Sequence, residues 1–148
     1  MYLDNPSQTI IASDAGVTRS EALTGSGGVF YVKQAKAITI TEGLGTSEYI
    51  EFRAPGEGSF MYSEAVGLDL HLARTLFKCQ LPALDYSGDI WPKLTAVPAT
   101  HHGRGGAFYV KNANTISSDT NIFEKCYLSP RGGVFSIFAT ASVTDTNS

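Results

Sequence analysis

The sequence lacks any apolar run that approaches the roughly 20 residues of a membrane-spanning helix. It also lacks a stretch of ten or more residues with the three- and four-residue apolar spacing of an amphipathic helix. Charged residues make up only 17% of the 148 residues, the net charge is −3, and the 11 Lys and Arg are scattered. Nucleic-acid binding needs a basic patch. We therefore expect one strand-rich domain over residues 1–148, with no membrane span and no nucleic-acid partner.

Signatures of several enzyme classes are also missing. The chain has no Gly-x-Ser-x-Gly nucleophile motif, no phosphate-binding loop and no zinc-ligand spacing. The segment Met1–Pro6 has neither the basic start nor the apolar core of a signal peptide, and proline excludes Asn5-Pro6-Ser7 as a glycosylation acceptor. We expect no cofactor and no metal, and we assign no catalytic residue.

What the chain does contain is a repeated phrase. Gly27–Lys33 reads Gly-Gly-Val-Phe-Tyr-Val-Lys and returns as Gly-Gly-Ala-Phe-Tyr-Val-Lys at Gly105–Lys111. A looser copy is Gly132–Ile137, and a degenerate one is Gly58–Ser63. A repeat of this length sets the architecture of a protein, because each copy is one structural unit.

Each copy continues into further apolar stretches with alternating polar residues, which is typical of short strands. The second stretches are Ala37–Ile40, Leu68–Leu72, Thr115–Ser117 and Ser142–Thr144, and the third stretches are Leu76–Cys79 and Ile122–Cys126. The distance from Gly105 to Gly132 is 27 residues and that from Gly27 to Gly58 is 31, but Gly58 to Gly105 spans 47. The excess falls in residues 80–104, which we predict to be a loop insertion.

Three short strands per copy predict an all-β chain, a parallel β-helix of about four to five coils. Phe30, Phe108 and Phe135 should form one column, with Met61 between the first two. The alternative is an antiparallel sandwich, which also has many short strands but does not need a recurring phrase.

These residues carry a family resemblance. The phrases Gly105–Asn114 and Asn121–Cys126 resemble the repeats of polymorphic outer membrane protein-type adhesins and of very large repeat proteins of protist cell surfaces. The resemblance spans residues 27–148 and implies a right-handed, pectin-lyase-like parallel β-helix. The second copy departs from it, since Ser59 replaces the second glycine and Asp69-Leu70-His71 replaces a threonine-rich strand.

The two cysteines occupy equivalent places in the aligned copies. Cys79 lies 21 residues after Gly58, and Cys126 lies 21 residues after Gly105. Their Cα atoms should then lie within roughly 7 Å, so that a disulfide could form, as suits an extracellular protein. A buried pair of free thiols is the alternative.

The insertion is the best candidate for recognition, because an exposed Trp and Tyr beside carboxylates suit a sugar or protein contact. Its candidate binding residues are Trp91, Tyr86, Asp85, Asp89, His101 and His102. Alternatively, Trp91 folds back and covers the side of the strands.

Pectin-lyase-like enzymes use carboxylates and a basic residue on one face, so the resemblance directs attention to such a set. It would comprise Asp69, His71, Arg74, Asp119 and Asp145. The alternative is a solvated strand face. The hydroxyl-bearing segments Thr39–Thr41 and Thr144–Thr146 share one station, with Ser117–Asp119 between them, and resemble ice-binding faces or O-glycan acceptors.

The sequence thus favours a structural or adhesive protein of the cell surface or extracellular space, acting as a spacer, stalk or fibre element. A carbohydrate-active enzyme and a carbohydrate- or ice-binding module are the alternatives. Neither Met1–Ile11 nor Val134–Ser148 resembles a cap, so we expect end-to-end stacking with further repeats or with other copies, besides possible glycan partners.

Overall fold

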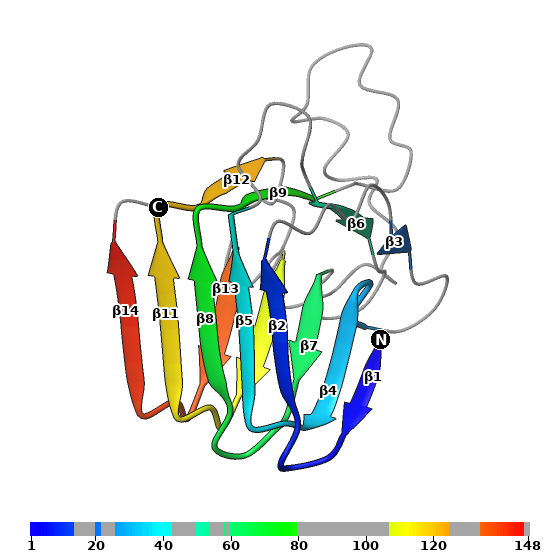
Figure 1. Cartoon of the computed structure of the whole chain (residues 1–148), viewed down its shortest axis with the longest axis vertical. Coiled ribbons are helices and arrows are strands. Elements are labelled where there is room, and N and C mark those ends of the chain that lie inside the picture. The colour runs from blue at the N-terminus through cyan, green and yellow to red at the C-terminus, as the bar shows by residue number, and fades with distance from the viewer. Residues whose placement is uncertain are drawn as a thin grey trace, which may run out of the picture.

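The computed structural model describes residues 1–13, 20–21, 26–42, 50–53, 58, 60–79, 107–124 and 134–146. Within these ranges the chain is all-β, with no helix and three parallel sheets (Figure 1). Sheet A contains β1 (Tyr2–Asp4), β4 (Phe30–Gln34), β7 (Met61–Ser63), β10 (Phe108–Lys111) and β13 (Phe135–Phe138). Sheet B contains β2 (Thr9–Ser13), β5 (Ala37–Thr41), β8 (Asp69–Ala73), β11 (Thr115–Asp119) and β14 (Ser142–Thr146). Sheet C contains β3 (Ser20–Glu21), β6 (Ile50–Arg53), β9 (Leu76–Cys79) and β12 (Ile122–Glu124).

The chain visits the three sheets in the same order each time, and we call one passage through A, B and C a circuit. Every described strand pairs in parallel with the strand three places before or after it. Figure 1 shows sheet B as a row of arrows in front, sheet A behind it and sheet C across the top. This arrangement is compatible with a β-solenoid, and the antiparallel alternative is wrong for the described strands.

The predicted aromatic column is confirmed. In sheet A, Phe30 pairs with Met61, Met61 with Phe108, and Phe108 with Phe135. The rings of Phe108 and Phe135 stack with centroids 4.8 Å apart. Met61 and Phe108 are fully buried. A sequence repeat therefore becomes a spatial column, because parallel pairing brings equivalent residues of successive circuits side by side.

The first glycine of the phrase is required by the backbone. Gly27 and Gly58 adopt φ values of 69° and 58°, in the left-handed region that only glycine occupies cheaply. A Cβ on Gly58 would lie 1.9 Å from the carbonyl oxygen of Met61, and one on Gly27 would lie 2.1 Å from that of Phe30. This explains why the degenerate copy keeps Gly58 although it loses the second glycine.

A buried asparagine closes the corner between sheets B and C. The Asn121 side-chain nitrogen donates to the carbonyl oxygen of Leu72 and to Ser118 Oγ, each at 3.0 Å. Its Oδ1 accepts from the backbone N–H of Thr75 at 3.1 Å. The amide thus links two circuits and supplies hydrogen bonds that a buried corner needs.

We expect Gly58→Ala to lower the free energy of unfolding by about 2–5 kcal/mol, because left-handed strain adds to overpacking against backbone atoms. Gly67→Ala is the matched control, since Gly67 has a φ of 76° but a Cβ added there would meet no atom within 4 Å. That control should cost only about 1–2 kcal/mol. Equal losses in urea denaturation would contradict the close approach at Gly58.

Phe108→Ala should cost about 3–5 kcal/mol, because it removes a fully buried ring from the centre of the column. Phe138→Ala provides the comparison, as Phe138 is 39% exposed at the edge of sheet A. Thermal unfolding monitored by circular dichroism would measure both. A Phe108 variant no less stable than the Phe138 variant would show that the column does not hold the sheets together.

Candidate functional site

The outer face of sheet B presents three rows of side chains that run across all five strands. We call it the hydroxyl face, because nine of its fifteen outward residues are Ser or Thr. Its members are Thr9, Ile11, Ser13, Ala37, Thr39, Thr41, Asp69, His71, Ala73, Thr115, Ser117, Asp119, Ser142, Thr144 and Thr146. No Lys, Arg or Glu stands among them, so the face offers many neutral hydrogen-bonding groups and little charge.

The strand register confirms that the hydroxyl-bearing segments Thr39–Thr41, Ser117–Asp119 and Thr144–Thr146 occupy equivalent positions in their strands. Thr39 pairs with His71, His71 with Ser117, and Ser117 with Thr144. Thr41 stands in the next row, in line with Thr146. His71 is exposed and interrupts the middle row of hydroxyls, as the sequence predicted.

Asp69 is held by the circuit that follows it. Asn114 Nδ2 donates to Asp69 Oδ1 at 2.8 Å, and Thr115 Oγ1 donates to the same oxygen at 2.6 Å. These two hydrogen bonds, with a smaller contribution from the positive charge of Lys36, hold the pKa of the Asp69 carboxyl below its ordinary value. Asp69 therefore remains ionised at neutral pH. This state suits a carboxylate that holds Asn114 and Thr115 in place, and it does not suit a proton donor.

The other members of the predicted acid–base set are dispersed. His71 lies two residues from Asp69 on the same face of β8. Arg74 follows that strand, with a left-handed φ of 48°, and its guanidinium lies 2.8 Å from Glu42 Oε1. Asp119 occupies the far row of β11, opposite Ala73. From strand geometry the Cα atoms of Asp69 and Asp119 are about 14 Å apart, beyond the usual spacing of paired glycosidase carboxylates.

The expectation that Asp145 shares one face with the other members of this set is wrong. Asp145 pairs with Ser118, whereas Asp119 pairs with Thr146. Because successive side chains of a strand point to opposite faces, Asp145 falls in the inward row, in line with Ser118 and Leu72. The predicted set therefore does not share one face.

Sequence reasoning missed a ladder of aromatic rings on the outer face of sheet A. The ring centroids of Tyr2 and Tyr31 are 5.7 Å apart, those of Tyr31 and Tyr62 are 4.9 Å apart, and those of Tyr62 and Tyr109 are 5.1 Å apart. Phe138 continues the ladder, 5.5 Å from Tyr109. The available signal was the Tyr that follows Phe in the phrase, which parallel pairing turns into a stack.

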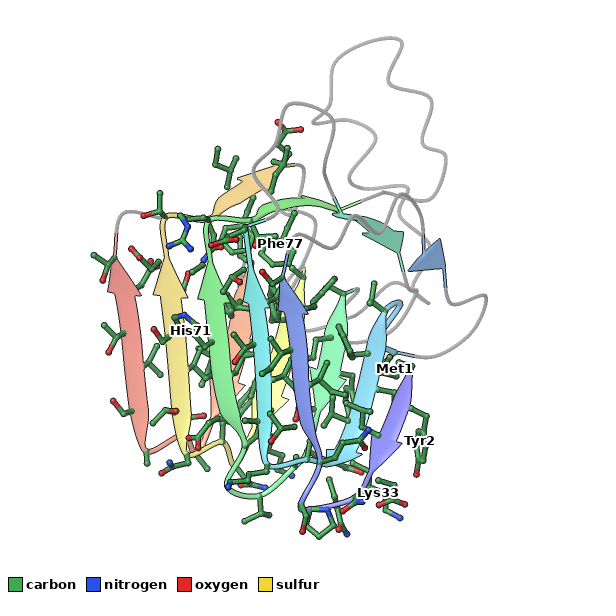
Figure 2. All side chains as sticks on the ribbon, in the orientation of Figure 1. Met1, Tyr2, Lys33, His71 and Phe77 are labelled. Carbon is green, nitrogen blue, oxygen red and sulfur yellow. The ribbon has the colours of Figure 1, made fainter. Side chains whose placement is uncertain are left out.

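A shallow depression lies next to this ladder. It has a volume of about 380 Å³ and is lined by Pro6, Lys33, Gln34, Ala35, Glu64 and Val66. Lys33 Nζ lies 3.3 Å from Asp4 Oδ2, and this hydrogen bond and ion pair raise the pKa of Lys33. Figure 2 places Lys33 and Tyr2 together at the N-terminal edge of sheet A. Both partners of the ion pair are half-exposed, so we assign the depression no ligand.

The six predicted binding residues all lie outside the described part of the chain: Tyr86, Asp85, Asp89, Trp91, His101 and His102. Cys126 also lies outside it. Cys79 is the last residue of β9. In that strand Lys78 pairs with Glu124 of β12, so paired residues are 46 positions apart. Cys79 and Cys126 are 47 positions apart, one more than this offset. The disulfide stays a prediction. In the described ranges no group of three or more His, Cys, Asp or Glu could hold a metal ion.

No family model, curated protein or solved structure matches this chain in comparisons with known proteins. Among the residues that the structure describes, no helix has the length and apolar character needed to cross a membrane.

Thr115→Val should destabilise the protein more at pH 7 than at pH 3. The pKa of Asp69 is lowered by folding, so its contribution is present above the unfolded-state value of about 3.9 and is lost as pH falls through the lower folded-state value. Thr39→Val, on the same face but without a carboxylate partner, should show no such dependence. Urea denaturation at both pH values would measure this, and parallel pH profiles for the two variants would contradict it.

Proposed function

We propose that this chain is a right-handed parallel β-helix that serves as a structural or adhesive element of the cell surface or extracellular space. In this role it acts as a spacer, stalk or fibre element. The observation that carries the proposal is the parallel pairing of sheets A and B across five strands each, which keeps one register except for a shift between Leu3 and Asp4 of β1. Such a stack lengthens by about 4.8 Å with every circuit, and each added circuit uses the same pairing as the one before it.

The hydroxyl face supports the adhesive part of the proposal. Its exposed groups include Thr9, Thr115 and Thr144, and most of its members are small and uncharged. A flat surface of this kind can make many weak hydrogen bonds to a glycan or to another polar surface, and several weak contacts together give useful avidity. The exposed hydroxyls of Thr9 and Thr144 are available for O-linked sugars, whereas that of Thr115 donates to Asp69.

A carbohydrate-active enzyme is the second candidate, because Asp69 and His71 share the outer face of β8. Two features argue for the structural role. Asp69 is committed to hydrogen bonds from Asn114 and Thr115, and Asp119 lies about 14 Å away by strand geometry. Asp69 and Asp119 thus do not have the spacing that glycoside hydrolysis uses.

Antibody labelling of intact and permeabilised source cells tests the proposed location directly. The proposal expects label on intact cells, and label that appears only after permeabilisation would overturn it. Incubation of the purified chain with a panel of acidic and neutral polysaccharides tests the enzyme. Chain cleavage that is lost in both Asp69→Asn and His71→Asn, but kept in Asp119→Asn, would replace the structural proposal with the second candidate.

Thiol titration under denaturing conditions tests the predicted bridge between Cys79 and Cys126. We expect no reactive thiol before reduction and two after it, because an oxidising compartment favours the disulfide when the cysteines are within reach. The Cys79→Ser variant should then expose one free thiol without reduction. Two reactive thiols in protein purified without reductant from an oxidising compartment would contradict the bridge.

A further inference from the structure

One inward row of sheet B changes character toward β14. In sheet B one row runs through Ala12, Ile40, Leu72, Ser118 and Asp145. Ile40, Leu72 and Ser118 are all buried, and Ser118 accepts a hydrogen bond from Asn121. Asp145, on β14, is exposed. An apolar row therefore ends in a carboxylate at the position where the next strand of sheet B would cover it.

The neighbouring inward row of β14 remains apolar. Val143 stands in line with Ile116 and Leu70, and it is 52% exposed because no described strand covers it. The inward side of β14 thus offers one apolar contact and one charge. Inward-pointing charges are a known device by which edge strands avoid pairing with other chains.

A second copy of this chain fits β14 except at the charge. If the register continues, β2 of the second copy places Ile10 against Val143 and Ala12 against Asp145. In sheet A the same step places Leu3 of the second copy against Ile137 of β13. Two of the three aligned pairs are therefore apolar, and the third sets a carboxylate against a methyl group.

That mismatch is large enough to decide the association. Burial of an unpaired carboxylate costs several kcal/mol, and the neutral acid costs much less. The described side chains that face the inward side of β14 are Ile116 and Ser118 of β11, Phe123 of β12, and Phe135 and Ile137 of β13. None of them titrates or carries charge, and neither do Ile10 and Ala12 of the second copy. Protonation of Asp145 would remove the charge from the inward row of β14.

We propose that β14 is a docking edge for β2 of a second copy, kept closed at neutral pH by the Asp145 carboxylate and opened by its protonation. This inference rests on the proposed structural role, and it names the partner and the condition under which the stack extends. Acidification should convert separate molecules into head-to-tail assemblies, with Val143 and Ile10 at the centre of each junction.

Sedimentation velocity over a range of protein concentrations at pH 7 and pH 4.5 tests the proposal. The wild-type protein should associate at least about tenfold more tightly in acid, which corresponds to about 1.4 kcal/mol. Asp145→Leu should associate at pH 7 and lose most of the pH dependence. Asp119→Leu is the matched control, because it makes the same change on the outward face of the adjacent strand, and it should behave as wild type.

A second substitution identifies the partner edge. Ala12→Asp in the Asp145→Leu background returns a carboxylate to the junction from the other side, so association at pH 7 should fall back at least tenfold. Circular dichroism would confirm that each variant is folded. Equal association of wild type at both pH values, or equal association of the Asp145 and Asp119 variants, would overturn the closed edge. Absence of association in every variant and condition would exclude the second copy, while surface labelling of cells would still decide the structural role.

Discussion

Parallel pairing in register is the constraint on which this structure depends. It places each side chain about 4.8 Å from the residue at the same station of the next circuit. Phe108 therefore meets Met61 on one side and Phe135 on the other, and Thr115 meets Asp69. A substitution acts on its own circuit and on both neighbours. The rows, and not single residues, are the units that decide whether a surface is apolar, aromatic, hydroxylated or charged.

The recurring phrase made sheet A predictable. Because the phrase includes the residues of the strand itself, aligning the copies also aligned Phe30, Phe108 and Phe135, and the structure confirms that column. Alternation predicted the faces equally well, since Ile38 and Ile40 are buried and Thr39 faces outward. Both patterns are local, so a single sequence carries them without any knowledge of the rest of the fold.

Aligning the copies by counting residues from their first glycine gives a wrong register after the corner between sheets A and B. Phe108 follows Met61 by 47 residues, but Thr115 follows Asp69 by only 46. The corner between β7 and β8 therefore holds one residue more than the corner between β10 and β11. The extra residue is accommodated where Gly67 adopts a φ of 76° and Val66 is 83% exposed. A slip of one residue exchanges the two faces of a strand, so station counting was unreliable for side chains after this corner.

The candidate site was less predictable than the fold because its contacts join distant residues. Asn114 and Thr115 reach Asp69 across 45 and 46 positions, and only the sheet B register brings them together. The tyrosine ladder has the same origin. Each tyrosine looks like an ordinary outward residue of its own strand, and the stack between Tyr62 and Tyr109 exists only after the strands have paired.

The interior admits polar groups only where the chain supplies their partners. Ser63 Oγ accepts from the backbone N–H of Ala65 at 3.3 Å, and Thr75 Oγ1 donates to the carbonyl oxygen of Ala73 at 3.0 Å. Asn121 satisfies Ser118 in the same way. In the described part of the chain, no buried side-chain nitrogen or oxygen lacks a hydrogen-bond partner. Since an unsatisfied buried group costs about 1–3 kcal/mol, each inward polar residue needs a partner, and Ser63 and Thr75 find theirs two residues away in their own circuit. Among these groups the Asn121 amide also bonds to Leu72 and Thr75 of the preceding circuit, so it ties two circuits together, whereas the apolar rows stabilise the stack by burial.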